Sequence, residues 1–123
     1  MITLQQYLMG REKEYPLSLE QALNAADLLS RVNYLLAKLG IVANVSSGYR
    51  PGHYNKAAGG AIKSNHLICK AIDLKDSTGI IANTLRNNVK LLEECGLWLE
   101  NPDRTNGWAH LDTKQRTNRI FNP

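Results

Sequence analysis

Two stretches of the chain decide its organisation: Ser64–Asp73, with the sequence SNHLICKAID, and Gly107–Asp112, with the sequence GWAHLD. The chain contains three histidines, and two of them, His66 and His110, lie in these stretches. The first stretch also carries Asp73, close behind its histidine. We therefore expect the remaining chain to form the scaffold that brings these side chains together.

The first stretch predicts a strand over Ile68–Leu74. Side chains alternate between the two faces of a strand, so Asp73 would share a face with Cys69 and Ala71. It would be an isolated carboxylate on an otherwise apolar strand. A buried carboxylate is costly unless it is paired or bound to a metal. Asp73 is therefore a candidate metal ligand.

The second stretch predicts the last strand, Gly107–Thr113. On it, Trp108, His110 and Asp112 share one face, while Leu111 points to the core. Two imidazoles and one carboxylate, with a fourth position left for water, form the usual arrangement of a catalytic zinc site. Spacing alone leaves an alternative open, in which the three residues are a loop histidine, a turn former at a strand end and a satisfied sheet histidine.

Capping residues and hydrophobic periodicity predict an α+β fold. The longest amphipathic segment begins after Ser18, a helix cap, and ends at Gly40, and a second amphipathic helix is predicted over Ile80–Cys95. The shorter predicted elements are a helix over Leu4–Met9 capped by Thr3, a helical turn over Tyr54–Ala58, a loop over Gly59–Asn65, and strands over Ile41–Val45 and Leu97–Glu100. We expect one domain over residues 1–123, with two long helices packed on a small, mainly antiparallel sheet.

The composition limits the class of protein. Met1–Tyr7 lacks the basic and apolar regions of a secretory signal, and no apolar run approaches the roughly 20 residues that span a bilayer. Two cysteines, Cys69 and Cys95, are expected to be reduced and are too few for a zinc site made of cysteine alone. The net charge of +4 favours anionic partners, but Lys and Arg are scattered, so we expect no nucleic-acid partner.

Three motifs, in order and at the right spacing, resemble one enzyme superfamily. Residues 64–73 fit the pattern S-x-H-x-x-C-x-A-x-D, which is similar to the Ser-x-His-x-x-Gly-x-Ala-x-Asp signature of the zinc D-Ala-D-Ala carboxypeptidase and L-Ala-D-Glu endopeptidase superfamily. Ser47–Arg50, SGYR, resembles a segment upstream of that signature, and Trp108–Asp112, WAHLD, resembles the segment with the last zinc-binding histidine. The cysteine form of the signature and the short turn Asn101–Asp103 resemble small bacteriophage-encoded members.

The resemblance implies the hedgehog/DD-peptidase fold, a Zn²⁺ ion and the peptide stems of peptidoglycan as substrate. Carried over by motif position, the zinc ligands would be His66, Asp73 and His110. Arg50 would contact a substrate carboxylate or the developing oxyanion, a role that suits a fixed guanidinium. The other candidates for substrate contact are Ser64, Tyr49 and Trp108.

The chain departs from the superfamily pattern at two positions. The motif glycine is Cys69 here, a change expected to alter packing, with a thiol ligand as the alternative. Many members carry Glu or Asp three residues before the last histidine, where this chain has Gly107. Asp112 is the first candidate in its place, since it could orient the histidine or act as general base. Glu100 is the next candidate, followed by Asp103.

These observations predict a zinc-dependent peptidase that hydrolyses peptide-stem bonds of bacterial peptidoglycan. We expect a phage endolysin or virion-associated lysin that has no signal peptide of its own and acts on the wall after release from the host cytoplasm, or within the virion. The missing carboxylate at Gly107 motivates a second hypothesis. In it, the same fold and zinc site belong to a catalytically weak or inactive wall-binding component of a phage virion, with other virion proteins as partners.

Overall fold

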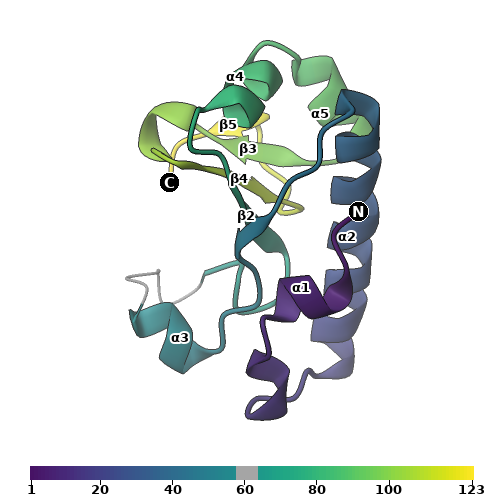
Figure 1. Ribbon diagram of the computed structural model, residues 1–123, viewed down its shortest axis with the longest axis vertical. Helices are drawn as coiled ribbons and strands as arrows, with labels where there is room; N and C mark the ends of the chain where they lie inside the picture. The colour runs from purple at the N-terminus through teal and green to yellow at the C-terminus, as the bar shows by residue number, and fades with distance from the viewer. Residues whose placement is uncertain (58–63) are drawn as a thin grey trace.

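The structure is a computed structural model that describes residues 1–57 and 64–123 (Figure 1). The loop predicted over Gly59–Asn65 lies mostly outside these residues. The helices are α1 (Leu4–Leu8), α2 (Leu19–Leu39), α3 (Gly52–Ala57), α4 (Ile80–Arg86) and α5 (Val89–Cys95), with the 3₁₀ helices η1 (Arg11–Lys13) and η2 (Pro102–Arg104). The strands are β1 (Val45–Ser47), β2 (Ala71–Lys75), β3 (Trp98–Glu100), β4 (Trp108–Asp112) and β5 (Ile120–Phe121).

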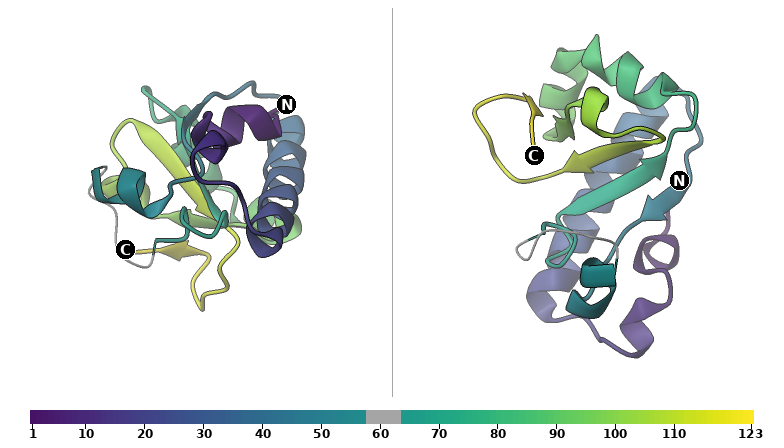
Figure 2. Two further views of the ribbon diagram at one scale, coloured as in Figure 1. Left: turned by 90° about the horizontal axis from the view of Figure 1, so that it is seen from below. Right: turned by 90° about the vertical axis from the view of Figure 1, so that its left-hand side faces the viewer.

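The strands form a sheet in the order β1-β2-β4-β3-β5. Neighbouring strands are antiparallel except β3 and β5, which run parallel. One face of the sheet packs toward α2, which passes behind it in the right-hand view of Figure 2. The buried residues on this face of the two central strands are Ile72, Leu74, Ala109 and Leu111. The predicted α+β class with a mainly antiparallel sheet is therefore confirmed.

The long helix α2 supplies most of the surface on which the sheet packs. Ser18 and Gln21 form a capping box at its start, and Gly40 caps its end in the left-handed conformation, with φ 66°. Its buried side chains recur every three or four residues: Ala25, Leu28, Leu29, Val32, Leu35 and Leu36. Both predicted ends of this helix are confirmed. No helix among the described residues is long and apolar enough to cross a membrane.

The prediction of a second long helix over Ile80–Cys95 is wrong. Two short helices, α4 and α5, replace it, and the chain breaks between them at Asn87 and Asn88. Asparagine side chains compete for backbone hydrogen bonds and disfavour helix interiors. Here the Asn87 side chain donates to the carbonyl of Asn83, and Asn88 leaves the helical region of backbone space. This interruption lets α5 pack its buried face against α2. Hydrophobic spacing alone could not reveal the interruption, because the apolar positions on both sides of it fit one continuous helix.

The strand predicted over Ile68–Leu74 begins later than expected, at Ala71. Cys69 has φ 61°, in the left-handed region that extended backbone does not use. It therefore lies in the turn before β2 and not on the strand face with Asp73. The first strand is also displaced, because the segment predicted over Ile41–Val45 only begins to pair at its last residues.

The C-terminal tail forms a strand that no sequence pattern predicted. The tail leaves β4, loops outward and returns along β3, where it forms β5 (Figure 2). The backbone N–H of Leu99 donates to the carbonyl of Arg119 at 3.0 Å, and that of Asn101 donates to the carbonyl of Phe121 at 2.7 Å. These bonds bring the last residues of the chain back to the part of the sheet that holds His110.

Candidate metal centre

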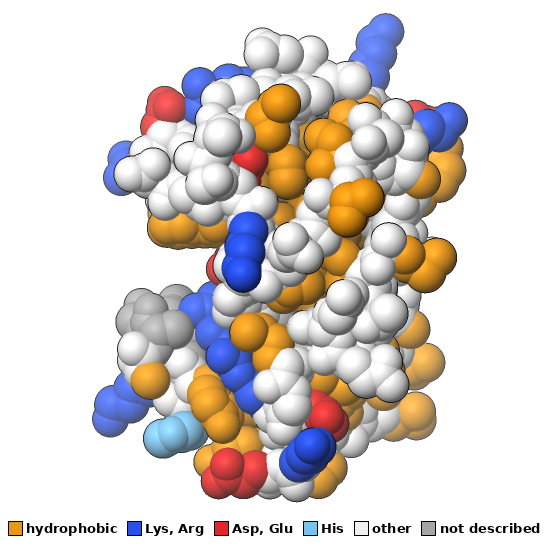
Figure 3. Space-filling view, in the orientation of Figure 1, with side chains coloured by type: hydrophobic (Ala, Val, Ile, Leu, Met, Phe, Trp, Pro, Cys, Tyr) orange, Lys and Arg blue, Asp and Glu red, His pale blue; other side chains and the backbone are white. Residues whose placement is uncertain are grey.

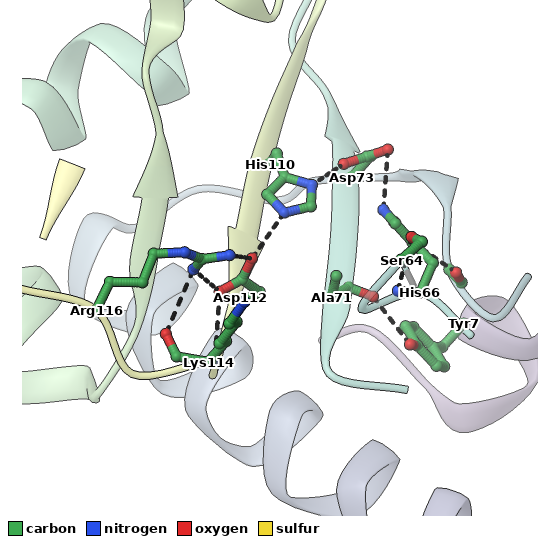
Figure 4. Close-up of polar contacts among 10 residues, drawn as sticks. Tyr7, Ser64, His66, Ala71, Asp73, His110, Asp112, Lys114 and Arg116 are labelled. Atoms are coloured by element: carbon green, nitrogen blue, oxygen red, sulfur yellow. Dashed lines mark hydrogen bonds and ion pairs between the residues drawn. The ribbon is translucent and has the colours of Figure 1, made fainter. Parts of the chain in front are cut away.

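The first histidine of the centre, His66, lies in the turn before β2 and is 1% exposed. Its backbone N–H donates to Ser64 Oγ at 3.2 Å, so Ser64 shapes the turn that carries the histidine. Its Nδ1 lies 2.8 Å from the carbonyl oxygen of Gly48, which can only accept a hydrogen bond. The proton of the neutral ring is therefore on Nδ1. The bare Nε2 faces Asp73 Oδ2 at 3.4 Å (Figure 4).

Gly48 is required by the packing beside this bond. A Cβ at position 48 would lie 2.0 Å from the carbonyl oxygen of Tyr7 in α1. That same oxygen accepts the N–H of Tyr49 at 3.1 Å, so α1 and the SGYR segment are in backbone contact. The segment therefore serves the centre by presenting a carbonyl to His66.

Asp73 and His110 meet across the two central strands. The β2–β4 register pairs them directly, and Asp73 Oδ1 lies 2.8 Å from His110 Nδ1. The other ring nitrogen, Nε2, lies 2.9 Å from Asp112 Oδ2. His110 thus presents Nδ1 toward the centre and Nε2 away from it, as Figure 4 shows.

His66, Asp73 and His110 each offer a ligand atom, and these atoms all lie within 4.8 Å of one another. Two imidazole nitrogens and a carboxylate oxygen suit Zn²⁺. A second observation supports the fit: His66 Nε2 is buried and has no hydrogen-bond partner among the described residues. Buried polar atoms are seldom left without a partner, and a metal ion would supply it.

The electrostatics of the centre favour an ionised carboxylate. Burial alone would raise the pKa of Asp73, but the hydrogen bond from His110 and the nearby imidazole of His66 outweigh it and hold the pKa well below its usual range. Burial would lower the pKa of His110, whereas its contacts with Asp112 and Asp73 raise it to about 9. Without an ion, His110 can therefore carry a proton on both ring nitrogens and donate one hydrogen bond to Asp73 and one to Asp112.

Asp112 is fully buried at the end of β4. Besides His110, its carboxylate accepts the backbone N–H of Lys114 at 3.2 Å and an Arg116 side-chain N–H at 3.1 Å. Burial opposes its ionisation, but the bonds from His110 and Arg116 lower its pKa. The structure thus places this residue behind the histidine, where carboxylates commonly orient metal-bound imidazoles.

Glu100, at the end of β3, lies across from His110 on the side of β4 away from Asp73. The β3–β4 register pairs Trp98 with Asp112 and Leu99 with Leu111, and one further step places Glu100 opposite His110. Glu100 is half-buried, and burial raises the pKa of its carboxyl. The third candidate, Asp103, lies in η2, is exposed, and forms an ion pair with Arg86 at 2.8 Å.

Arg50 follows the SGYR segment and is half-buried. Its backbone N–H donates to the carbonyl of His66 at 3.2 Å, which ties it to the centre. Its Nε is buried without a hydrogen-bond partner among the residues that the structure describes. Burial lowers the pKa of this guanidinium, while the charge of Asp73 acts in the opposite direction. The side chain is therefore placed near the carboxylate of the centre with donor capacity unused.

Of the predicted substrate contacts, Tyr49 is buried and Trp108 is partly exposed. Tyr49 is 3% exposed, and its hydroxyl donates to the carbonyl of Tyr15 at 3.0 Å, so it belongs to the core. Trp108 is half-buried on the strand face of His110.

In the orientation of Figure 1, the surface is hollowed between α3 and the upper part of the sheet, and Lys and Arg side chains gather along the hollow (Figure 3).

Cys69 is buried in the turn between His66 and β2, and burial raises the pKa of its thiol to about 11. It is not part of the ligand group that the described residues form. Sequence reasoning missed a different contributor, Arg116, which contacts Asp112 from the tail. The spacing of four residues between Asp112 and Arg116 was the one sign of an ion pair in the sequence. The contact itself depends on the path that the tail takes after β4.

The His–Asp–His group is a ligand set of the kind that holds zinc in metallopeptidases. The family model described as Peptidase M15 matches residues 6–112, and the chain belongs to this family, within the zinc D-Ala-D-Ala carboxypeptidase superfamily. No curated protein and no solved structure gave a match to the chain.

Proposed function

We propose that the protein is a zinc peptidase that hydrolyses peptide-stem bonds of bacterial peptidoglycan. The observation that carries the proposal is the group of ligand atoms from His66, Asp73 and His110 within 4.8 Å of one another. Membership of the Peptidase M15 family supports the same reaction class and substrate.

The ligands would hold zinc through His66 Nε2, a carboxylate oxygen of Asp73 and His110 Nδ1. When bound, zinc supplies a Lewis acid that polarises a carbonyl and lowers the pKa of a water molecule. The protein fixes both imidazoles from behind. Gly48 accepts the Nδ1 proton of His66, and Asp112 accepts the Nε2 proton of His110.

Glu100 is the general base in this proposal. Asp112 is fully buried and its carboxylate is committed to His110 and Arg116, so it serves as the orienting group. Glu100 lies one strand across from His110, is partly accessible, and has a raised carboxyl pKa. A raised pKa makes a carboxylate a better proton acceptor near neutral pH. Glu100 would accept the proton of the attacking water on its carboxylate and deliver it to the leaving amine.

Arg50 would bind the substrate. The buried, unpartnered Nε and the position near Asp73 suit contact with a carboxylate of the peptide stem or with the developing oxyanion. Trp108, half-buried on the same strand face as His110, would flank the bound peptide.

Two histidine variants test the proposal. His66→Ala removes a ligand, whereas His53→Ala removes an exposed histidine in α3 and serves as the matched control. We expect one zinc per chain and release of soluble muropeptides from purified walls by the parent protein and His53→Ala, with loss of both in His66→Ala. A metal-free parent protein that is inert on walls from several bacteria would refute the proposal.

A second candidate is a wall-binding component that keeps the fold and zinc site but turns over poorly, as part of a phage particle. The specific observation behind it is that Gly107 replaces the usual acidic residue and that Asp112 is committed elsewhere. It would predict sedimentation with purified walls and full zinc occupancy without muropeptide release, with Glu100→Gln indistinguishable from the parent. Muropeptide release that depends on Glu100 would exclude it.

A further inference from the structure

The C-terminal tail, residues 113–123, lies beyond the segment matched by the family model, yet it contacts the metal centre. Arg116 forms a bidentate ion pair with Asp112: one guanidinium nitrogen contacts each carboxylate oxygen, Nη2 at 3.1 Å from Oδ2. Asp112 in turn accepts the Nε2 proton of His110 at 2.9 Å. A continuous chain of charged hydrogen bonds therefore runs from the tail to a metal ligand.

The carboxylate in the middle of this chain depends on its partners. Asp112 is 0% exposed, and its acceptors are used by His110, Lys114 and Arg116. A buried carboxylate that loses its cationic partner keeps its desolvation cost without compensation. Without Arg116, the Asp112 carboxylate would lose two of its hydrogen bonds, one on each oxygen, and would hold the ring of His110 less firmly.

The tail also supplies an aromatic ring that stacks against the guanidinium. The Arg116 guanidinium carbon lies 3.5 Å from the centroid of the Phe121 ring. The ring of Phe121 also approaches the ring of His110 edge-on, with centroids 6.0 Å apart. Because β5 is bonded to β3 through the carbonyl of Phe121, the aromatic ring is itself held in place. Arg116 is therefore clamped between an aromatic ring and the carboxylate.

We propose that Arg116 is a positioning residue of the metal centre, which acts through Asp112 to hold His110 with Nδ1 toward the ion. The inference rests on the proposed metal site and deepens it. The tail is then a working part of the centre, and the fixed fork of arginine is needed because two oxygens of one buried carboxylate must be held together.

The tail offers a matched control. Arg119 lies in the same segment, its guanidinium carbon is 4.0 Å from the Trp98 ring centroid, and its Nη1 donates to the carbonyl of Leu97 at 3.2 Å. It anchors the tail in a similar way but has no contact with Asp112. Arg119→Gln therefore loosens the tail without breaking the proposed chain.

The test measures the zinc dissociation constant by competition with a chromophoric chelator. We expect Arg116→Gln to weaken zinc binding 10–100-fold, the usual effect of removing a group that orients a ligand, and Arg119→Gln to stay within about threefold of the parent. Arg116→Lys keeps the charge but loses the fork, and should fall between them; it also carries the test if Arg116→Gln does not fold. Equal zinc affinity in the Arg116 and Arg119 variants overturns the proposal.

A readout on the metal-free protein separates this inference from the proposed function. The hydrogen-bonded Nε2–H proton of His110 should give a protected NMR signal in the parent and in Arg119→Gln, and lose it in Arg116→Gln. If the parent binds no zinc, the proposed function fails while this signal still decides the role of Arg116. A signal that survives in Arg116→Gln overturns the positioning role whatever the zinc result.

Discussion

The carbonyl oxygen of Gly48 lies 2.8 Å from Nδ1 of His66. An N–H on Nδ1 donates to this oxygen and leaves Nε2 free to face Asp73. The same glycine also permits the contact with α1, since any Cβ there would lie 2.0 Å from the carbonyl oxygen of Tyr7. One backbone position therefore both orients a metal ligand and closes the packing of the first helix.

Gly48→Ala should damage both functions of this position. The new methyl group cannot fit against Tyr7 unless the backbone moves, and overpacking of this kind costs about 1–3 kcal/mol of unfolding free energy. The moved carbonyl would release His66, so we also expect at least tenfold weaker zinc binding. Urea unfolding and chelator competition measure the two effects.

Gly52→Ala is the control for Gly48→Ala, because a Cβ at Gly52 meets no atom within 4 Å. This variant should bind zinc like the parent. Gly52 is the first residue of α3, and alanine favours a helix more than glycine does. Parent-like affinity and stability in Gly48→Ala would show that the contact with Tyr7 does not constrain the centre.

Cys69 occupies the motif position at which the superfamily pattern has glycine, and its φ of 61° gives the reason for that glycine. Left-handed backbone costs a residue with a side chain about 1–2 kcal/mol. Cys69→Gly removes this strain but also removes a buried side chain, so we expect the two terms to offset within about 1 kcal/mol. Cys69→Val adds β-branching at the same backbone angle and should be clearly destabilised. Thermal unfolding distinguishes the two variants.

A buried cysteine elsewhere in the chain controls for simple packing effects. Cys95 ends α5 and is buried, without the left-handed backbone. Cys95→Val should therefore lose less stability than Cys69→Val. The raised pKa of Cys69, about 11, also predicts that its thiol is unreactive toward alkylating reagents in the folded protein. Equal losses at both cysteines would remove the backbone explanation.

The sequence predicted the elements whose signals are local. Ser18 and Gly40 mark the ends of α2 because capping depends on a few adjacent residues. The residues of the ligand group, which spacing and resemblance indicated, come together because Asp73 and His110 pair across the β2–β4 register. Alternation of side chains along a strand made the face of each residue predictable, whereas the register that pairs them follows from the structure.

The features that were missed depend on contacts between distant segments. The break at Asn87 and Asn88 interrupts a hydrophobic pattern that fits a continuous helix. The left-handed turn at Cys69 is hidden because the residue there is not glycine. The contact of Arg116 with Asp112 needs the tail to turn after β4 and return as β5, and a two-residue strand carries no periodicity.

Glu100→Gln should separate proton transfer from metal binding. If Glu100 is the base, the variant should lose kcat by about 10²–10⁴-fold and keep its zinc affinity within a few-fold. Asp112→Asn should show the opposite order, with weaker zinc binding first, because Asp112 orients His110. Glu93→Gln, an exposed change in α5, is the control for loss of a negative charge. Unchanged kcat in Glu100→Gln would assign the base elsewhere.

Removal of the metal should make the stability of the protein fall as pH rises from neutral. The contacts with Asp112 and Asp73 raise the pKa of His110 to about 9, against an ordinary value of about 6.5 in the unfolded chain. A group whose folded pKa is raised stabilises the fold fully below its unfolded pKa, and this contribution is lost as pH rises through its folded pKa. Urea unfolding in a chelator should therefore give a lower free energy of unfolding at pH 9.5 than at pH 6, and His110→Gln should reduce that difference. Zinc must displace the same proton, so its affinity should increase over this pH range. If the metal-free protein is equally stable at both pH values, His110 does not carry the additional proton that its contacts with Asp73 and Asp112 are expected to hold.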